Sequence, residues 1–245
     1  MKKLRILAIL SLFGLVAFAC SQALSPVNLT FGPGKKPDEV SNSLQILAML
    51  TVLSLAPAIM ILTTAFTRIV IIFSFVRSAL GTQSIPPNQV LIGLSLFMTF
   101  FVMAPTFSEV NTKALKPYQE KQISYDQAIK EAQKPVRAFM LKNTYEKDLS
   151  LFLDMRAEQP RTAEDVSLTS LIPAFIISEL KTAFIVGFYI FVPFIVIDLI
   201  VASGLMSMGM MMLPPTVVSL PAKILVFILA DGWHTIVQAI MQGYQ

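Results

Sequence analysis

The strongest constraint on this chain is that charged residues and prolines interrupt its most apolar stretches. Five charged side chains fall within residues 171–203 and 217–234: Glu179, Lys181, Asp198, Lys223 and Asp231. On membrane-insertion scales a central Lys or Asp costs about 2.5 to 3.5 kcal/mol, whereas a Leu or Ile contributes only about 0.3 to 0.6 kcal/mol. We therefore predict that these segments are buried against other protein, either copies of the same chain or sister subunits, rather than surrounded by lipid.

The composition is that of a membrane protein. Hydrophobic residues make up 55% of the chain against 14% charged, and the mean hydropathy is +0.69, well above the values of soluble domains. Residues 106–170 contain 20 of the 34 charged side chains, ten of each sign, whereas residues 44–105 contain only Arg68 and Arg77. The net charge of +4 includes three cations in the first five residues, so a nucleic-acid-binding surface is not expected.

The N-terminal sequence predicts a secretory signal. A basic start, an apolar run and a small-x-small ending predict a cleavable signal peptide over residues 1–19. Cys20, the only cysteine, resembles a lipidation site, but ordinary cleavage fits the preceding residues better. A lone cysteine excludes an intramolecular disulfide. Residues 20–43 are rich in Pro, Gly, Ser and charge, and predict a flexible leader.

The remaining chain predicts an all-α fold of hydrophobic helical hairpins with a polar helical insert. Residues 44–105 are predicted to form N-terminal hydrophobic helices, residues 106–170 a charged insert, and residues 171–245 C-terminal hydrophobic helices. Residues 44–67 are uncharged and long enough for one helix across the ~30 Å hydrocarbon layer. A Gly and a Pro-Pro pair predict a turn at residues 81–88, after which an apolar helix should end before Pro105.

The insert carries local helix signals. SYDQ at residues 124–127 predicts a capping box, and Pro135 stands where a second helix could begin. Val136, Phe139 and Met140 mark one apolar face. The acids of the insert are matched by an equal number of bases, which favours a solvated face over catalytic carboxylates.

The charges in the apolar segments need partners. Glu179 and Lys181 are two residues apart, so they lie on different sides of a helix and cannot pair with each other. We expect Glu179 and Lys223 to form an ion pair; the alternative is that each charge reaches an interface separately. Arg68 and Arg77 place the neighbouring turn on the cytoplasmic side, which puts the insert in the periplasm.

A methionine-rich loop, GLMSMGMMMLPP, occupies residues 204–215. Five of the 13 methionines of the chain fall between Met206 and Met212. Thioether side chains are flexible and uncharged, so a ring of them would form a deformable seal. Two other interpretations remain open: a hydrophobic loop in a core or at a membrane surface, and a copper(I) site, since MxM spacing occurs here.

Enzymatic signatures are missing from the sequence. His234 is the only histidine, no GxSxG motif occurs, and Asp198 and Asp231 lack the surroundings of an aspartyl dyad. We therefore expect no enzymatic activity, no metal and no cofactor. A membrane transporter for small solutes or copper(I) is the alternative function, because intramembrane charges and Pro-interrupted helices are typical of transporters.

Five segments in fixed order resemble the FliP family of type III secretion export-gate subunits, which includes the injectisome SctR proteins. They are FTRIVIIFSFVRSALGTQSIPPNQVLIGLSLFMTFFVMAP (66–105), PAFIISELKTAF (173–184), FVPFIVIDLIVAS (191–203), MGMMMLPP (208–215) and LPAKILVFILADGW (220–233). The resemblance covers nearly the whole chain after about Leu44. The signal peptide and the long insert favour the flagellar branch of the family.

The resemblance implies a function in the flagellar basal body at the bacterial inner membrane. Five copies would assemble with FliQ-like and FliR-like subunits into a helical cone, near FlhB-like and FlhA-like export components, and would pass unfolded flagellar proteins. The family's methionine gasket matches four residues here: Met208, Met210, Met211 and Met212. The resemblance also implies that Glu179 and Lys223 make contacts between subunits.

Overall fold

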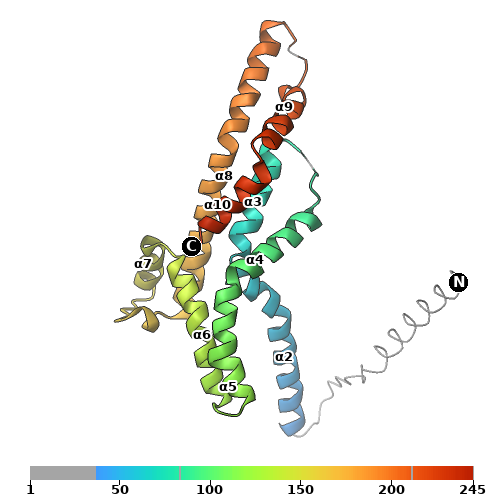
Figure 1. Ribbon diagram of the computed structural model, residues 1–245. Coiled ribbons are helices and arrows are strands. Elements are labelled where there is room, and N and C mark those ends of the chain that lie inside the picture. The colour runs from blue at the N-terminus through green and yellow to red at the C-terminus, as the bar shows by residue number, and fades with distance from the viewer. Residues whose placement is uncertain (1–36, 83, 211, 245) are drawn as a thin grey trace, which may run out of the picture. The chain divides into compact units, whose positions relative to one another are not determined.

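The computed structural model describes residues 37–82, 84–210 and 212–244, and every regular element in these ranges is a helix (Figure 1). The predicted all-α fold is therefore confirmed. The predicted signal peptide and Cys20 lie outside the described residues. The chain divides into two units, residues 1–55 and residues 56–245, and the candidate site lies in the second.

In the first unit, the described residues belong to helix α2, which spans Pro37–Leu62. This helix begins before the predicted start at Leu44. Proline is favourable in the first helical turn because its missing N–H has no partner there in any case. The last part of the predicted leader is thus helical.

The first hydrophobic stretch is broken where the sequence predicted continuity. Helix α2 ends at Leu62 and α3 runs over Phe66–Ala79, so the prediction of one helix over residues 44–67 is wrong. The predicted turn is confirmed, because α4 starts at Asn88. Pro105, predicted to end that helix, lies inside α4, which continues to Val110. The buried side chains of Met103 and Thr106 flank the proline, so packing keeps the helix intact across it.

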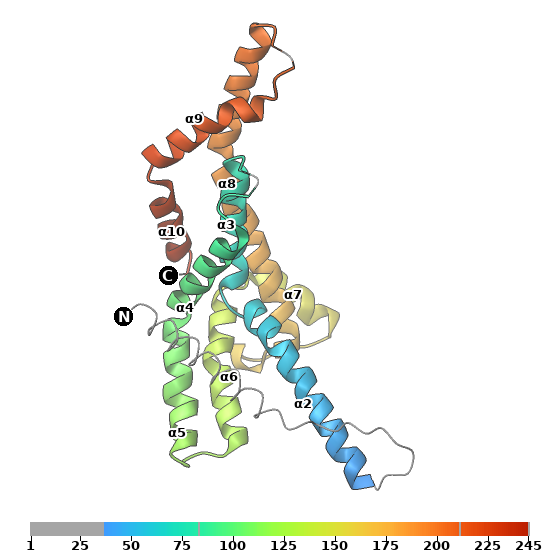
Figure 2. The same ribbon diagram turned by 90° about the vertical axis from the view of Figure 1, so that its right-hand side faces the viewer.

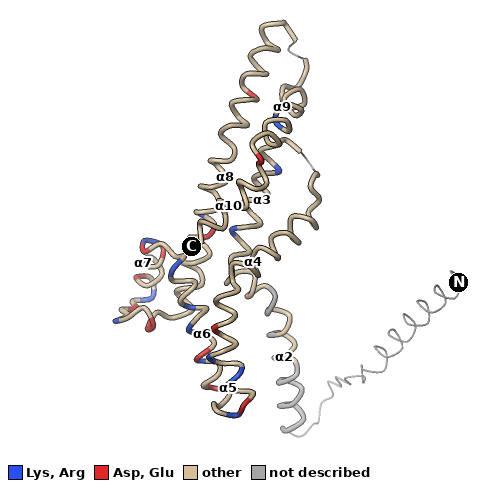
Figure 3. Tube along the Cα trace, viewed as in Figure 1, with Lys and Arg blue, Asp and Glu red and all other residues tan. Residues whose placement is uncertain are grey.

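Helix α4 passes into a one-turn π-helix, Asn111–Leu115, and then α5, Lys116–Gln119. The polar insert follows with α6, Tyr125–Lys142, and α7, Glu146–Met155, and then the short 3₁₀ helix η2, Ala163–Asp165. Figure 3 shows charged residues gathered around α5, α6 and α7.

The predicted capping box of the insert is confirmed. The Ser124 side chain accepts from the backbone N–H of Gln127, and the Gln127 side chain accepts from the N–H of Ser124. Pro135 does not start a second helix but lies buried inside α6. The apolar residues that follow it, Val136, Phe139 and Met140, pack into one cluster with Phe175 of α8, so tertiary contacts hold the helix where the proline lies.

Helix α8 spans Leu168–Ser207, 40 residues, or about 60 Å at 1.5 Å per residue. Ser167 caps it by accepting from the backbone N–H of Thr169. Helix α3 packs along α8, and the two helices share the main core of the unit. Gly187 permits this approach, because a Cβ atom there would lie 2.4 Å from the ring of Phe75.

Two shorter helices complete the unit. Helix α9, Pro215–Leu229, and α10, Gly232–Gln242, are bent by 63° at the break between them; Figure 2 shows this bend. At the corner Asp231 has the left-handed conformation, with φ of 46°. Trp233 of α10 contacts Phe227 and Phe73, with ring centroids 5.4 and 6.2 Å away, so aromatic packing ties the corner to α3.

Two helical stretches of the described chain are long and apolar enough to cross a membrane: residues 88–119 and α8. The number rises to four if each of two bent pairs, α2 with α3 and α9 with α10, forms a single span. This count depends on length and composition only. It agrees with the membrane class that the sequence predicted.

Candidate functional site

The turn between α8 and α9 exposes methionine side chains. Four described methionines there are exposed: Met206, Met208, Met210 and Met212, the last of which retains 99% of its accessible surface. Met211 lies outside the described residues. In this chain the loop is not part of a core, so burial within the single subunit does not explain its methionines.

The backbone of this turn is fixed by a helix C-terminal motif. Gly209 has φ of +74°, a conformation that costs glycine little. The N–H of Met210 donates to the carbonyl of Leu205 over 3.0 Å, and the N–H of Gly209 donates to the carbonyl of Met206 over 3.1 Å. This pair of bonds is the Schellman arrangement. Pro215 then occupies the first position of α9, where proline is favourable.

An ion pair joins α8 to α9 on the helical side of the turn. Lys223 Nζ lies 2.6 Å from Asp198 Oδ2, and Ser219 Oγ donates to Asp198 Oδ1 over 2.5 Å. Lys223 also donates to the backbone carbonyl of Ala79, at the end of α3, over 3.3 Å. The Lys223 side chain is 4% exposed and that of Asp198 is 28% exposed, so the cation is buried while water reaches the acid. We call Asp198, Ser219 and Lys223 the turn clamp.

A second ion pair joins α3 to α8 in the core. Arg68 binds the Glu179 carboxylate through two nitrogens: Nε donates to Oε2 over 3.0 Å, and Nη2 donates to Oε1. Glu179 is completely buried and Arg68 is 5% exposed. A two-point contact between guanidinium and carboxylate is the strongest geometry available to such a pair.

Gly243 and Tyr244, the residues after α10, make further contacts with this second ion pair. Tyr244 donates its hydroxyl proton to Glu179 Oε2 over 2.7 Å, and its ring lies 4.0 Å from the Arg68 guanidinium carbon. Arg68 Nη1 donates to the backbone carbonyl of Gly243 over 3.1 Å. Burial, and secondarily the charge of Glu179, raise the pKa of Tyr244 well above its ordinary value, so the hydroxyl remains a donor at physiological pH.

Within the described chain, Glu179 and Lys223 do not pair with each other: Glu179 binds Arg68, and Lys223 binds Asp198. Each charge thus has a partner on a neighbouring helix of the same chain. A contact between Glu179 and Lys223 of different subunits, and burial of the apolar segments against other chains, stay predictions.

The remaining charges of the apolar segments, Arg77, Lys181 and Asp231, have different environments. Lys181 is exposed on α8 and lies 4.6 Å from the centre of the Tyr145 ring, the geometry of a cation–π contact. Arg77 is half-buried and donates to Asn88 Oδ1 over 2.5 Å. Asp231 is exposed at the α9–α10 corner. Within the single chain Lys181 and Asp231 are exposed, so their burial against other subunits stays a prediction.

Sequence reasoning missed three groups of the two networks. No sequence pattern marks these groups, which are Tyr244, Ser219 and the carbonyl of Ala79. A hydroxyl or a carbonyl becomes the partner of a charge only when folding brings the two together. Among the described residues, no group of three His, Cys, Asp or Glu side chains is arranged to hold a metal ion.

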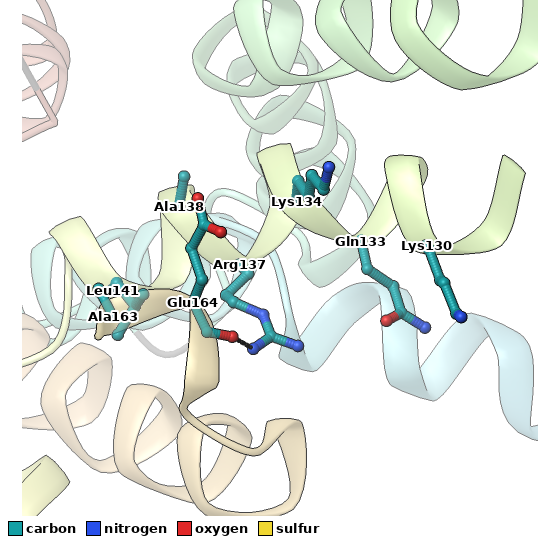
Figure 4. Close-up of a pocket in the computed structure, with 8 residues that line it drawn as sticks. All are labelled: Lys130, Gln133, Lys134, Arg137, Ala138, Leu141, Ala163 and Glu164. Atoms are coloured by element: carbon teal, nitrogen blue, oxygen red, sulfur yellow. Dashed lines mark hydrogen bonds between the residues drawn. The ribbon is translucent and has the colours of Figure 1, made fainter. Parts of the chain in front are cut away.

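The insert also carries a basic groove of about 490 Å³ between α6 and η2. Figure 4 shows Lys130, Gln133 and Arg137 on one side of α6, with Arg137 donating to the carbonyl of Glu164. Arg137 also donates to the carbonyl of Val166 over 2.6 Å. These bonds fasten the segment before α8 onto α6, which gives the groove a structural role.

Comparison with known proteins identifies the family. The model of the FliP family matches residues 49–240. The protein named flagellar biosynthetic protein FliP from Bacillus subtilis is 57% identical over 209 residues, which cover 85% of this chain and 95% of the relative. Proteins of the same name from Caulobacter vibrioides and Aquifex aeolicus are 46% and 44% identical, over 99% and 93% of this chain and 92% and 95% of their own lengths. The chain therefore belongs to the FliP family.

Proposed function

We propose that this chain is a pore-forming core subunit of the flagellar type III export gate, which passes unfolded flagellar proteins across the bacterial inner membrane. The chain belongs to a family whose members are named for flagellar biosynthesis, and this supports a function in flagellar export. The exposed methionines of the turn between α8 and α9 are the observation that supports a pore-forming role in flagellar export. Copies of the chain would bring their turns together around one channel, where the methionines form a gasket.

The surface of the chain supports assembly with other subunits. Large apolar side chains are exposed along α4 and α8, among them Phe97, Phe101, Phe188, Tyr189 and Leu199. Monomeric soluble proteins rarely expose such continuous apolar surface. We propose that other copies of the chain, five in all, and FliQ-like and FliR-like subunits cover it, with FlhB-like and FlhA-like export components nearby. The assembly would lie in the flagellar basal body, with the insert in the periplasm.

The chemistry of the turn suits a seal that must open for many sequences. Methionine has three rotatable bonds and a polarisable sulfur, so it fills irregular gaps. It carries no charge that would select among the side chains of a passing polypeptide. The turn clamp supports this role because it fixes α9 to α8 on the helical side of the turn. The flexible methionine side chains therefore extend from helices whose positions are fixed.

A triple substitution tests the gasket. In a flagellated bacterium that expresses the full export apparatus, Met208, Met210 and Met212 are changed together to Ala. The hydrogen bonds of Gly209 and Met210 are made by the backbone and should survive. We expect the cells to leak small ions, measured with a dye sensitive to membrane potential, while the purified assembly keeps its size. Met155→Ala, at an exposed methionine on α7, is the matched control and should leave the membrane tight.

An assembled triple-Ala variant that stays ion-tight would overturn the gasket. Changing the same three residues to Leu separates the proposal from copper(I) transport, because leucine retains apolar bulk but has no sulfur ligand. We expect the triple-Leu variant to retain most of the seal and to support flagellar export. Loss of copper(I) transport with the seal unaffected would instead favour the transporter.

A further inference from the structure

Helix α10 is attached to the rest of the unit at its two ends. At its start, Asp231 adopts the left-handed conformation and the chain turns through 63° from α9. Along its 11 residues Ile236 and Ile240 are buried and belong to the main core. The two ends of α10 therefore act together with one apolar contact along the helix.

The far end of α10 is held by the two residues that follow it. Gly243 accepts a hydrogen bond from Arg68 of α3 over 3.1 Å, and Tyr244 donates to Glu179 of α8 over 2.7 Å. The Tyr244 ring also stacks on Phe139 of α6, with centroids 6.1 Å apart and an interplanar angle of 18°. This dipeptide therefore connects α10 to three other helices.

The Gly243 side of the dipeptide borders polar solvent, whereas the Tyr244 side chain is largely buried. A polar hollow of about 190 Å³ borders it, and Arg68, Lys142, Thr182 and Gly243 are among its lining residues. Lys142 Nζ donates to the carbonyl of Tyr244 over 3.3 Å at this edge. Water entering the hollow can replace the hydrogen bonds of the dipeptide one at a time, so the attachment can open without unfolding the α3–α8 core.

We propose that Gly243 and Tyr244 form a releasable strap. When docked, the strap holds α10 against α3 and α8 and completes the hydrogen bonding of the buried pair Arg68 and Glu179. When released, α10 can turn about the corner at Asp231, and Ile236 and Ile240 leave the core, while α3 and α8 remain packed. The strap is a conformational device of the single chain and does not depend on the proposed export function.

Hydrogen–deuterium exchange tests the strap in the full-length chain purified in detergent. The Tyr244→Phe variant keeps the ring but loses the bond to Glu179. We expect the amides of α10 to exchange roughly tenfold faster, because a hydrogen bond to a charged group contributes about that factor or more. Tyr244→Ala also loses the contacts of the ring with Arg68 and Phe139 and should accelerate exchange further. In both variants α7, which the dipeptide does not contact, should exchange at the wild-type rate.

Tyr189→Phe is the matched control, because this tyrosine is exposed on α8, and its α10 should exchange as in the wild type. If Tyr244→Ala does not fold, Tyr244→Phe decides the question alone. Exchange in α10 that is unchanged in Tyr244→Phe would overturn the strap. Exchange that rises equally in every helix would also overturn it, since that result means a general loss of stability instead of a local release.

Discussion

The two buried ion pairs differ in how completely protein replaces water around them. Glu179 has no accessible surface and receives bonds from Arg68 and Tyr244. Asp198 is partly exposed and receives bonds from Lys223 and Ser219. In a buried pair, the loss of one partner leaves an uncompensated charge, which costs more than the pair itself contributes.

The first prediction concerns Glu179→Ala, which leaves Arg68 buried without a carboxylate. We expect the free energy of unfolding to fall by about 3 to 5 kcal/mol, measured by denaturant unfolding in detergent. Glu109→Ala is the control, because its partner Lys113 lies four residues away on an exposed helix surface, where such pairs contribute about 1 kcal/mol or less. Equal small losses for the two variants would contradict a structural role for the Glu179 pair.

The second prediction uses charge reversal to test the turn clamp. Asp198→Lys and Lys223→Asp should each lower the melting temperature of the full chain, since each places like charges together. The double variant should recover part of that loss because the pair is restored with opposite polarity. The combination of Glu179→Lys with Lys223→Glu should show no recovery, since these two side chains have different partners. Recovery in that second combination would favour a direct contact between Glu179 and Lys223 across subunits.

The sequence could predict that the charges need protein partners, but not which partners. The spacing of Glu179 and Lys181 excludes their pairing by helix geometry alone. The contact between Arg68 and Glu179, by contrast, joins residues 111 positions apart. It depends on which faces of α3 and α8 meet, and that is a property of the tertiary packing.

At the scale of elements, close helix packing explains where local signals succeed and fail. The capping box at Ser124 was predictable because both of its partners lie within four residues. Pro105 and Pro135 do not end their helices as expected. A proline disfavours an isolated helix, but here buried neighbours, Met103 and Thr106 at the first and Met140 at the second, hold the helix in place. Tertiary contacts therefore decide the helix ends in the apolar segments.

The third prediction concerns the approach of α3 to α8. Gly187→Ala would place a methyl group 2.4 Å from the ring of Phe75, so the two helices must separate or the ring must move. We expect a loss of about 1 to 3 kcal/mol in the free energy of unfolding, as is usual for overpacked cores. Gly93→Ala in α4 is the control, since nothing lies within 4 Å of its added Cβ. It should be neutral or stabilising through higher helix propensity, and similar losses for both variants would contradict the packing argument.

At the scale of the whole molecule, the chain exposes more apolar surface than a solitary protein outside a membrane can support. The all-α class and the need for protein neighbours followed from composition and from the placement of charges. The role proposed for the methionine turn depended on family resemblance, because exposure of a side chain is settled only by the fold.

The fourth prediction is that the chain forms a multi-subunit particle. After co-expression with FliQ-like and FliR-like subunits, the detergent-solubilised complex should be several times larger than the 27.0 kDa chain, measured by light scattering after size-exclusion chromatography. A stable monomer that leaves both other subunits unbound would count against the export gate and in favour of a transporter.

The Schellman turn at Gly209 has a consequence for how a channel mouth could work. Its shape is set by main-chain hydrogen bonds and one left-handed glycine, none of which involves a thioether. Each methionine can therefore change rotamer without unwinding the helix that carries it. In the same few residues the backbone is rigid and the side chains are flexible. The methionine side chains around such an opening could therefore move aside for each passing residue and return to their earlier rotamers, while the backbone of the turn keeps its shape.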